Sequence, residues 1–252
     1  MAMIAVINQK GGVGKTTTTM NLSHALARAN KKVLAIDLDP QSHLTAGFGL
    51  RHAGQVGIAD VLMGEKDIFE VVVPARENVD LIPAGERLGE LEHLTSGGAK
   101  RGWLLNDALA EIKTQYDYVY FDCPPSSGIL GMNALLAADE VLIPVSGDFF
   151  ALQGLSRLMG IFKHIEQTLK RDIDKWVVLT RFQERRRLAR DVRDKIIGYF
   201  PKHVYQTPIR ETVALAESPG FGKTIFEYQQ NSNGAQDYMS LAKDVIKRSV
   251  VH

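Results

Sequence analysis

Three glycines and two lysines stand in one short segment that could hold a phosphate group. The segment is Lys10-Gly11-Gly12-Val13-Gly14-Lys15-Thr16, and Thr17 follows it directly. Glycines let the backbone curl around phosphate oxygens and aim its N–H groups at them. In such a loop the lysine at position 15 reaches the β and γ phosphates, and the hydroxyl at position 16 is a ligand for Mg²⁺. The segment therefore predicts a nucleoside triphosphate site formed by Gly11, Gly12, Val13, Gly14, Lys15, Thr16 and Thr17.

Carboxylates follow two other apolar runs of the chain. Asp37 and Asp39 come directly after the run 33–36, and Asp122 ends the run 118–122. Ligands of open α/β sheets bind beyond the carboxyl ends of the strands. We therefore expect Asp39 and Asp122 to lie near the phosphate loop. Asp37 comes earlier on its strand, so we expect it to have a structural role.

Short apolar runs rich in strand formers alternate with helical patterns along the chain. The expected strands are 3–7, 33–36, 79–83, 118–122, 141–145, 176–180 and a short one near 204–205, and the expected helices include 16–29, 103–114 and 235–248. Such alternation predicts an α/β fold with a doubly wound, mainly parallel sheet and helices on both faces. The segment 85–102 has many glycines and charges and little periodicity, which indicates a mobile surface excursion.

Composition limits the class of protein. The chain has 252 residues, 45% of them hydrophobic, a net charge of +1 and one cysteine, Cys123. A single cysteine excludes an intrachain disulfide and cysteine-rich metal ligation, and we expect it to be a packing residue. No apolar run is long enough to cross a bilayer, and no secretory signal is evident, so a cytoplasmic location is expected. We expect one domain over 1–252, with no helix-turn-helix before the first strand.

The phosphate loop departs from the standard pattern in an informative way. Gln9 stands where that pattern has its first glycine, and Lys10 lies at the mouth of the loop. This arrangement resembles the deviant Walker A loop of the ParA/MinD family of ATPases. Further segments are similar to the family, namely 37–41, 121–126, 138–145 and 207–222. The resemblance implies a P-loop NTPase fold, ATP and Mg²⁺ as cofactors, and a homodimer with ATP sandwiched at the interface.

The resemblance also implies roles for individual residues. Lys10 reaches across the dimer interface to the nucleotide of the partner subunit, as an arginine finger does. Asp39 aligns with the carboxylate that positions the attacking water, so Lys10, Lys15 and Asp39 are the predicted catalytic residues. Asp122 aligns with the carboxylate that holds Mg²⁺ through its water shell, next to Thr16. The base pocket is expected to be lined by Thr180-Arg181 and Pro208-Ile209, with Pro208 beside the base.

The segment 181–195 carries seven cations against three acids, a net charge of +4. Leu188, Val192 and Ile196 recur every four residues and predict the buried stripe of a helix. In isolation such a charge run is a solvated face. The resemblance implies instead non-specific DNA binding by Arg185, Arg186, Arg187, Arg190 and Arg193. Glu211 and Ala214 replace two arginines of the family pattern, so the DNA surface depends on the arginines of 185–193.

These observations favour an ATPase that dimerises on ATP, coats the nucleoid and positions a cargo such as a plasmid, a chromosome region or a protein assembly. A partner protein, ParB-like or a cargo adaptor, is expected to stimulate hydrolysis. Two alternatives stay open. A MinD-like membrane switch needs a free amphipathic C-terminal helix, whereas we interpret Leu241, Val245 and Ile246 as core packing, so no stable membrane association is expected. A metabolic phosphoryl transferase would show acceptor-dependent turnover that DNA does not affect.

Overall fold

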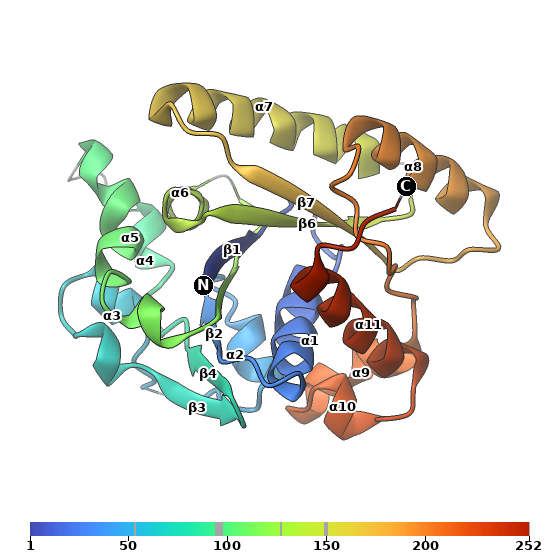
Figure 1. The fold of residues 1–252 in the computed structure, drawn as a ribbon. Coiled ribbons are helices and arrows are strands. Elements are labelled where there is room, and N and C mark those ends of the chain that lie inside the picture. Colours follow the sequence, from blue (N-terminus) through green and yellow to red (C-terminus); the bar gives the residue numbers. More distant parts are fainter. Residues whose placement is uncertain (53, 94–97, 127, 149–150, 252) are drawn as a thin grey trace.

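A seven-stranded sheet in the order β3-β4-β2-β5-β1-β6-β7 forms the centre of the molecule (Figure 1). The computed structural model describes residues 1–52, 54–93, 98–126, 128–148 and 151–251. The strands are β1 Ala2–Val6, β2 Val33–Asp37, β3 Val73–Arg76, β4 Val79–Ile82, β5 Tyr118–Asp122, β6 Glu140–Ser146 and β7 Asp174–Thr180. Six of them are parallel to their neighbours, and β3 alone among the named strands pairs antiparallel, with β4.

Helices cover both faces of the sheet, which confirms the predicted fold class. The α-helices are α1 Lys15–Arg28, α2 His43–Gly47, α3 Ile58–Leu62, α4 Glu90–His93, α5 Leu104–Ala108, α6 Ile129–Ala137, α7 Ala151–Leu169, α8 Arg187–Tyr199, α9 Val213–Glu217, α10 Ile225–Tyr228 and α11 Asn233–Lys247. Short 3₁₀ helices are η1 Ile68–Glu70, η2 Gly98–Trp103, η3 Ile112–Gln115 and η4 Ser218–Phe221. Figure 1 shows α7 and α8 on one side of the sheet and α1, α10 and α11 on the other.

Alternate residues of each strand pack into the two helix layers. In β1, Met3 and Ala5 join the core beneath α5, α6, α7 and α8, whereas Ile4 and Val6 join the core beneath α1 and α11. Central parallel strands are apolar on both faces because both faces are covered. All five residues of β2 are buried for this reason, including its last residue, Asp37.

Four expectations about the elements were wrong. The range 103–114 is not one helix, since it divides into the end of η2, α5 and η3. The segment 204–205 makes only isolated bridges to β7 and Val250. Leu188 is exposed, because residues spaced by four drift around a helix of 3.6 residues per turn; Ala189 instead joins Val192 and Ile196 in the core. Leu88 and Leu91, within the expected excursion 85–102, are also buried; residues 94–97 lie outside the described part.

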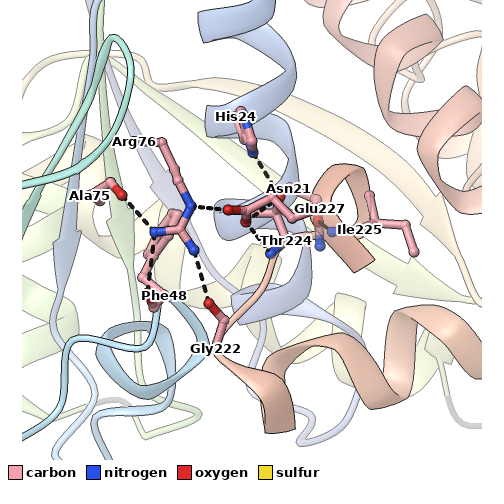
Figure 2. A network of polar contacts seen from close by, with 9 residues as sticks. All are labelled: Asn21, His24, Phe48, Ala75, Arg76, Gly222, Thr224, Ile225 and Glu227. Atoms are coloured by element: carbon pink, nitrogen blue, oxygen red, sulfur yellow. Dashed lines mark hydrogen bonds and ion pairs between the residues drawn. The ribbon is translucent and has the colours of Figure 1, made fainter. Parts of the chain in front are cut away.

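One arginine joins three elements at the β3 side of the molecule (Figure 2). Arg76 pairs with Glu227 of α10 at 2.7 Å, and its guanidinium donates to the carbonyls of Phe48, 3.3 Å away, and Gly222, 2.9 Å away. Thr224 caps α10 and contacts the ring nitrogen Nδ1 of His24 at 2.7 Å. The C-terminal helices are thereby fastened to α1 and to the end of α2, the helix that follows Asp39.

Candidate nucleotide-binding site

The carboxyl ends of β1, β2 and β5 meet at one edge of the sheet. Val6 and Asp37 each pair with Asp122 across neighbouring strands, so the chain leaves all three strands side by side. A cavity of about 630 Å³ opens at this edge. It is lined by Gly11, Gly12, Gly14, Lys15, Thr16, Thr17, Asp39, Gln41, His43, Pro125, Thr180, Arg181, Ile209, Arg210, Glu211, Thr212, Leu215, Ala216 and Tyr238. The cavity is therefore enclosed by the phosphate loop on one side and by C-terminal loops on the other.

The loop between β1 and α1 has the geometry of an anion site. Gly12 and Gly14 have φ angles of +71° and +87°, which side chains rarely allow. A Cβ atom added at Gly11 or Gly12 would meet no atom within 4 Å, so the backbone there is open to a ligand. Helix α1 begins at Lys15 with neither a side-chain cap nor an acidic residue in its first turn. Its first N–H groups and the positive end of its dipole are available to phosphate oxygens.

Lys15 is almost buried beside the loop, with 8% of its surface exposed. Its Nζ donates to the carbonyl of Lys10 at 3.4 Å, and burial lowers the pKa of the ammonium group. On the other side of the loop, the buried hydroxyl of Thr180, at the end of β7, donates to the carbonyl of Val13 at 2.7 Å. The loop is thus fixed to two strands before any ligand binds.

A hydroxyl and a carboxylate lie together beside the loop. Thr16 Oγ1 donates to Asp122 Oδ2 at 2.7 Å, and Thr19 Oγ1 lies 3.3 Å from Asp122 Oδ1. Asp122 is fully buried, and burial together with the nearby Asp37 raises the pKa of its carboxyl to about 8. Such a carboxylate is stabilised by a neighbouring cation. A hydroxyl and a carboxylate suit Mg²⁺, which keeps several waters and takes further ligands from phosphates. Among the described residues, no cluster of His, Cys, Asp or Glu could bind a metal without such help.

The turn after β2 holds the other carboxylates. Asp37 accepts hydrogen bonds from the backbone N–H and the hydroxyl of Thr45, at 2.8 and 2.6 Å, as a structural residue does. Asp39 Oδ1 accepts from the backbone N–H of Gln41 at 2.9 Å, which fixes its carboxylate at the cavity wall. Asp39 therefore lines the same cavity as the phosphate loop and is oriented by its own turn.

Lys10 does not line the cavity. Its Nζ forms an ion pair with Asp148, just after β6, and its backbone N–H donates to Asn8 Oδ1 at 3.1 Å. Asp148 also accepts from Ser146 Oγ at 2.6 Å. The two side chains of the ion pair are 32% and 46% exposed, so Lys10 lies at the surface beside the loop.

Most of the predicted nucleotide residues come together, with two differences. Val13 contributes a carbonyl to Thr180 and lies behind the lining, and the cavity is lined by Ile209 rather than by the neighbouring Pro208. Asp122 lies below Thr16. Sequence reasoning missed the lining residues Gln41, His43, Pro125, Arg210, Glu211, Thr212, Leu215, Ala216 and Tyr238. All of these except His43 and Tyr238 had a signal, because they stand within the segments 37–41, 121–126 and 207–222 that resemble the family.

The arginines of α8 point into solvent. Arg185, Arg186, Arg187 and Arg190 are exposed, and Arg193 is half-buried. Arg187 lies 3.9 Å from Asp191, whereas Arg193 pairs with the adjacent Asp194 at 3.1 Å and Arg190 donates to the carbonyl of Glu184 at 2.8 Å. Arg186 occupies the N-cap position of the helix without a side-chain capping hydrogen bond, and the first turn contains no acidic residue. Three consecutive arginines therefore lie at the positive end of a helix dipole.

The last helix packs against the sheet. Leu241 and Val245 of α11 are buried as expected, although Ile246 is 38% exposed. Tyr238 is buried with its hydroxyl 3.3 Å from Thr18 of α1. The apolar stripe of α11 is thus used within the core, which is unfavourable for a lipid-binding role. None of the helices in the described ranges is both long and apolar enough to cross a membrane.

A strand, a glycine-rich loop, a helix that begins with Lys15 and Thr16, and an acidic residue ending a neighbouring strand define a P-loop nucleotide-binding protein. Residues 1–175 match the model of a family described as AAA domain. The chain is 40% identical to the sporulation initiation inhibitor protein Soj of Bacillus subtilis over 96% of this chain and 97% of the relative. It is 39% identical to the chromosome partitioning protein ParA of Caulobacter vibrioides, covering 98% and 95%.

A solved structure is also similar over nearly the whole chain. Cobyrinic acid a,c-diamide synthase from Mycobacterium smegmatis, with bound ADP and magnesium, has a TM-score of 0.84 and 30% identity, with 98% of this chain and 95% of that chain covered. The chain therefore belongs to the ParA/Soj family of partition ATPases. This membership confirms the family indicated by the deviant loop.

Proposed function

We propose that this chain binds ATP with Mg²⁺, dimerises around the nucleotide, binds DNA without sequence preference and hydrolyses ATP when a partner protein stimulates it. In this proposal the whole chain acts as a single domain on the nucleoid. Its dimers position or segregate a cargo, which is a plasmid, a chromosome region or a protein assembly. The partner is ParB-like or an adaptor on the cargo.

The observation that carries the proposal is the convergence of Lys15, Thr16 and Asp39 on one cavity beside the open backbone of Gly11 and Gly12. Lys15 and the first N–H groups of α1 bind and orient the phosphates. Asp39, held by its own turn, orients a water molecule toward the γ phosphate. Thr16 and Asp122 would hold Mg²⁺, which would neutralise charge on the β and γ phosphates. The similar synthase binds ADP and magnesium, and we extend both ligands to this chain.

The trans role of Lys10 is supported by its position. Its ammonium group lies beside the loop but outside the cavity of its own subunit, in a half-exposed ion pair. A cation there can exchange its partner Asp148 for a nucleotide presented by a second subunit, where it stabilises charge that develops on the transferred phosphoryl group. Dimerisation then depends on the bound nucleotide.

The DNA role is supported by the arginines of α8. Cations at a helix N-terminus are destabilised by the dipole, so Arg185, Arg186 and Arg187 gain nothing locally from their position. A phosphate backbone relieves this repulsion and is attracted by both the side chains and the dipole. Two copies of α8 in a dimer double the number of phosphate contacts, which increases affinity and its dependence on salt.

An electrophoretic shift on arbitrary duplex DNA, combined with light scattering of the same samples, tests the proposal. We expect a dimer and a shifted band with ATP, and neither with ADP or without nucleotide. Lys15→Ala is the matched control, because it removes the phosphate contact and leaves α8 intact. A monomer at saturating non-hydrolysable ATP analogue contradicts the dimer, and equal shifts in all three nucleotide states contradict the switch.

A further inference from the structure

An ion pair bridges the rim of the nucleotide cavity. Arg181, the residue after β7, and Glu211, in the loop before α9, both line the cavity. Arg181 Nε and Nη2 donate to Glu211 Oε1 at 2.9 and 2.7 Å. The remaining nitrogen, Nη1, lies 3.3 Å from the carbonyl of Gly12 in the phosphate loop. One guanidinium therefore connects the C-terminal loop to the phosphate loop.

The carboxylate side of this bridge is held firmly. Gln183 donates its side-chain amide to Glu211 Oε2. These contacts with Arg181 and Gln183 lower the pKa of Glu211, which keeps it charged. The loop itself pairs with the end of β7, where Ile209 donates to the carbonyl of Leu179 at 2.8 Å. Arg210 anchors the same loop to Asp237 of α11 at 2.6 Å. Glu211 thus projects from a fixed backbone.

The guanidinium of Arg181 is exposed enough to contact a ligand as well as Glu211. Arg181 is 57% exposed although it makes three hydrogen bonds, and its backbone φ of +48° lies in the left-handed region, which is unfavourable for a residue with a side chain. Beyond it the wall becomes apolar, with Ile209, Leu215 and Ala216. The guanidinium therefore lies between the end of the cavity that suits phosphates and the end that suits a base.

We propose that Arg181 is a nucleotide-contacting residue, and that Glu211 is the positioning residue that holds its guanidinium across the ribose and phosphate of bound ATP to slow release. This inference rests on the proposed ATP site. A planar guanidinium presents several N–H donors in a fixed geometry. Those on Nε and Nη2 remain bonded to Glu211, while the other N–H groups contact the nucleotide. Holding it in place beforehand removes the entropy that a free arginine loses on binding.

Release of a fluorescent ATP analogue, mant-ATP, from the full chain with Mg²⁺ measures the effect. The complex is chased with excess ATP, and the dissociation rate is recorded for Arg181→Ala, Glu211→Gln and the double variant. We expect each single variant to release the analogue about 5- to 20-fold faster, since a charge-assisted contact is lost. The double variant should be no faster than Arg181→Ala, because the two residues act as one unit.

A matched control removes an ion pair of similar exposure away from the cavity. Arg87 and Glu65 pair at 2.8 Å on the surface, and Arg87→Ala with Glu65→Gln should leave the release rate unchanged. Arg181→Lys keeps the positive charge but loses the several N–H donors of the planar guanidinium. This variant should therefore still release mant-ATP almost as fast as Arg181→Ala does.

Three results separate this inference from the proposed function. If the unaltered chain does not bind mant-ATP, the proposed site is wrong. If it binds, Lys15→Ala abolishes binding, and Arg181→Ala releases at the normal rate with an unchanged melting temperature, only the role of Arg181 is overturned. If Arg181→Ala slows association and leaves dissociation unchanged, the arginine steers the nucleotide by charge and the positioning role of Glu211 is overturned.

Discussion

The charges of the nucleotide cavity and those of α8 differ in their surroundings. Lys15 and Asp39 are each 8% exposed and Asp122 is fully buried, and each is fixed by hydrogen bonds to named partners. The arginines of α8 mostly project into solvent, and Arg187 is 89% exposed. The charges of the cavity are held by buried contacts, whereas those of α8 are held, where they are held at all, by contacts at the exposed surface.

This difference indicates two kinds of ligand. Buried charges have lost their solvation, so their interaction with an opposite charge is strong. They therefore contribute most to the binding of a small ligand whose charges lie at fixed positions. Exposed charges suit a polymer whose phosphates repeat along its length, because many weak and screened contacts sum to a useful affinity. Removing one charge should therefore have a large, localised effect in the cavity and a smaller, salt-dependent effect on α8.

Lys15→Ala should have the largest effect. The β and γ phosphates lose their fixed cation, and ATP affinity should fall about 10³-fold or more, in line with the removal of a buried charge-assisted contact. Isothermal titration with a non-hydrolysable analogue measures this. Unchanged affinity in a variant that melts like the original chain would remove Lys15 from the site.

Asp39→Ala should separate binding from turnover. Without the carboxylate that orients water, kcat should fall about 10²-fold or more, while ATP binding and dimerisation persist. A phosphate-release assay gives the rate, and light scattering of the same sample gives the oligomeric state. Normal hydrolysis in the variant contradicts the assigned role of Asp39.

Arg186→Glu with Arg190→Glu should weaken DNA binding about 10- to 100-fold at moderate salt and flatten the dependence of affinity on salt concentration. The basal ATPase rate should stay the same. Lys66→Glu with Arg87→Glu is the control, since it makes the same change in net charge beside β3 and β4, at the edge of the sheet opposite to β7. Equal losses in both variants would mean that total charge, not α8, governs binding.

His24 extends the comparison to a buried group outside the cavity. Burial lowers its pKa from 6.5 to about 4, so the unfolded chain binds a proton more readily than the folded chain below pH 6.5. Stability is therefore lost as the pH falls from about 6.5 toward 4. Between pH 8 and pH 5, the original chain should lose about 1–2 kcal/mol more unfolding free energy than His24→Gln, the shift being discounted for a half-buried ring. Urea unfolding at both pH values measures the difference in unfolding free energy between the original chain and His24→Gln. If that difference is the same at pH 8 and pH 5, the burial effect is contradicted.

The phosphate side of the cavity could be predicted from the sequence because its parts are local. The loop 10–16 lies between β1 and α1, and Asp39 and Asp122 follow strand ends that any parallel sheet brings to one edge. The sequence indicates Thr180-Arg181 and Pro208-Ile209 at the base side, but the ion pair there could not be predicted in the same way. Arg181 and Glu211 stand 30 residues apart and meet through an isolated bridge between Phe182 and Arg210, which leaves no periodic signal.

Two other features were beyond sequence reasoning for similar reasons. Strand β3 has four residues, includes Pro74 and lies at a sheet edge, so its pattern is too short and too irregular to stand out. The partner of Lys10 is 138 residues away and follows β6 without any motif around it. Contacts of this kind depend on how the sheet orders its strands, not on neighbouring residues.

The ion pair between Lys10 and Asp148 has a consequence for nucleotide selection. In the proposed dimer, Lys10 leaves Asp148 of its own chain and contacts a phosphate held by the opposite subunit. Its contribution to the free energy of dimerisation is therefore the difference between these two ionic contacts. A half-exposed ion pair contributes only about 0–1 kcal/mol, and a single carboxylate competes poorly with the terminal group of a triphosphate. With a diphosphate that group is missing, and the carboxylate keeps the lysine. Asp148 would then set how sharply the subunits distinguish ATP from ADP.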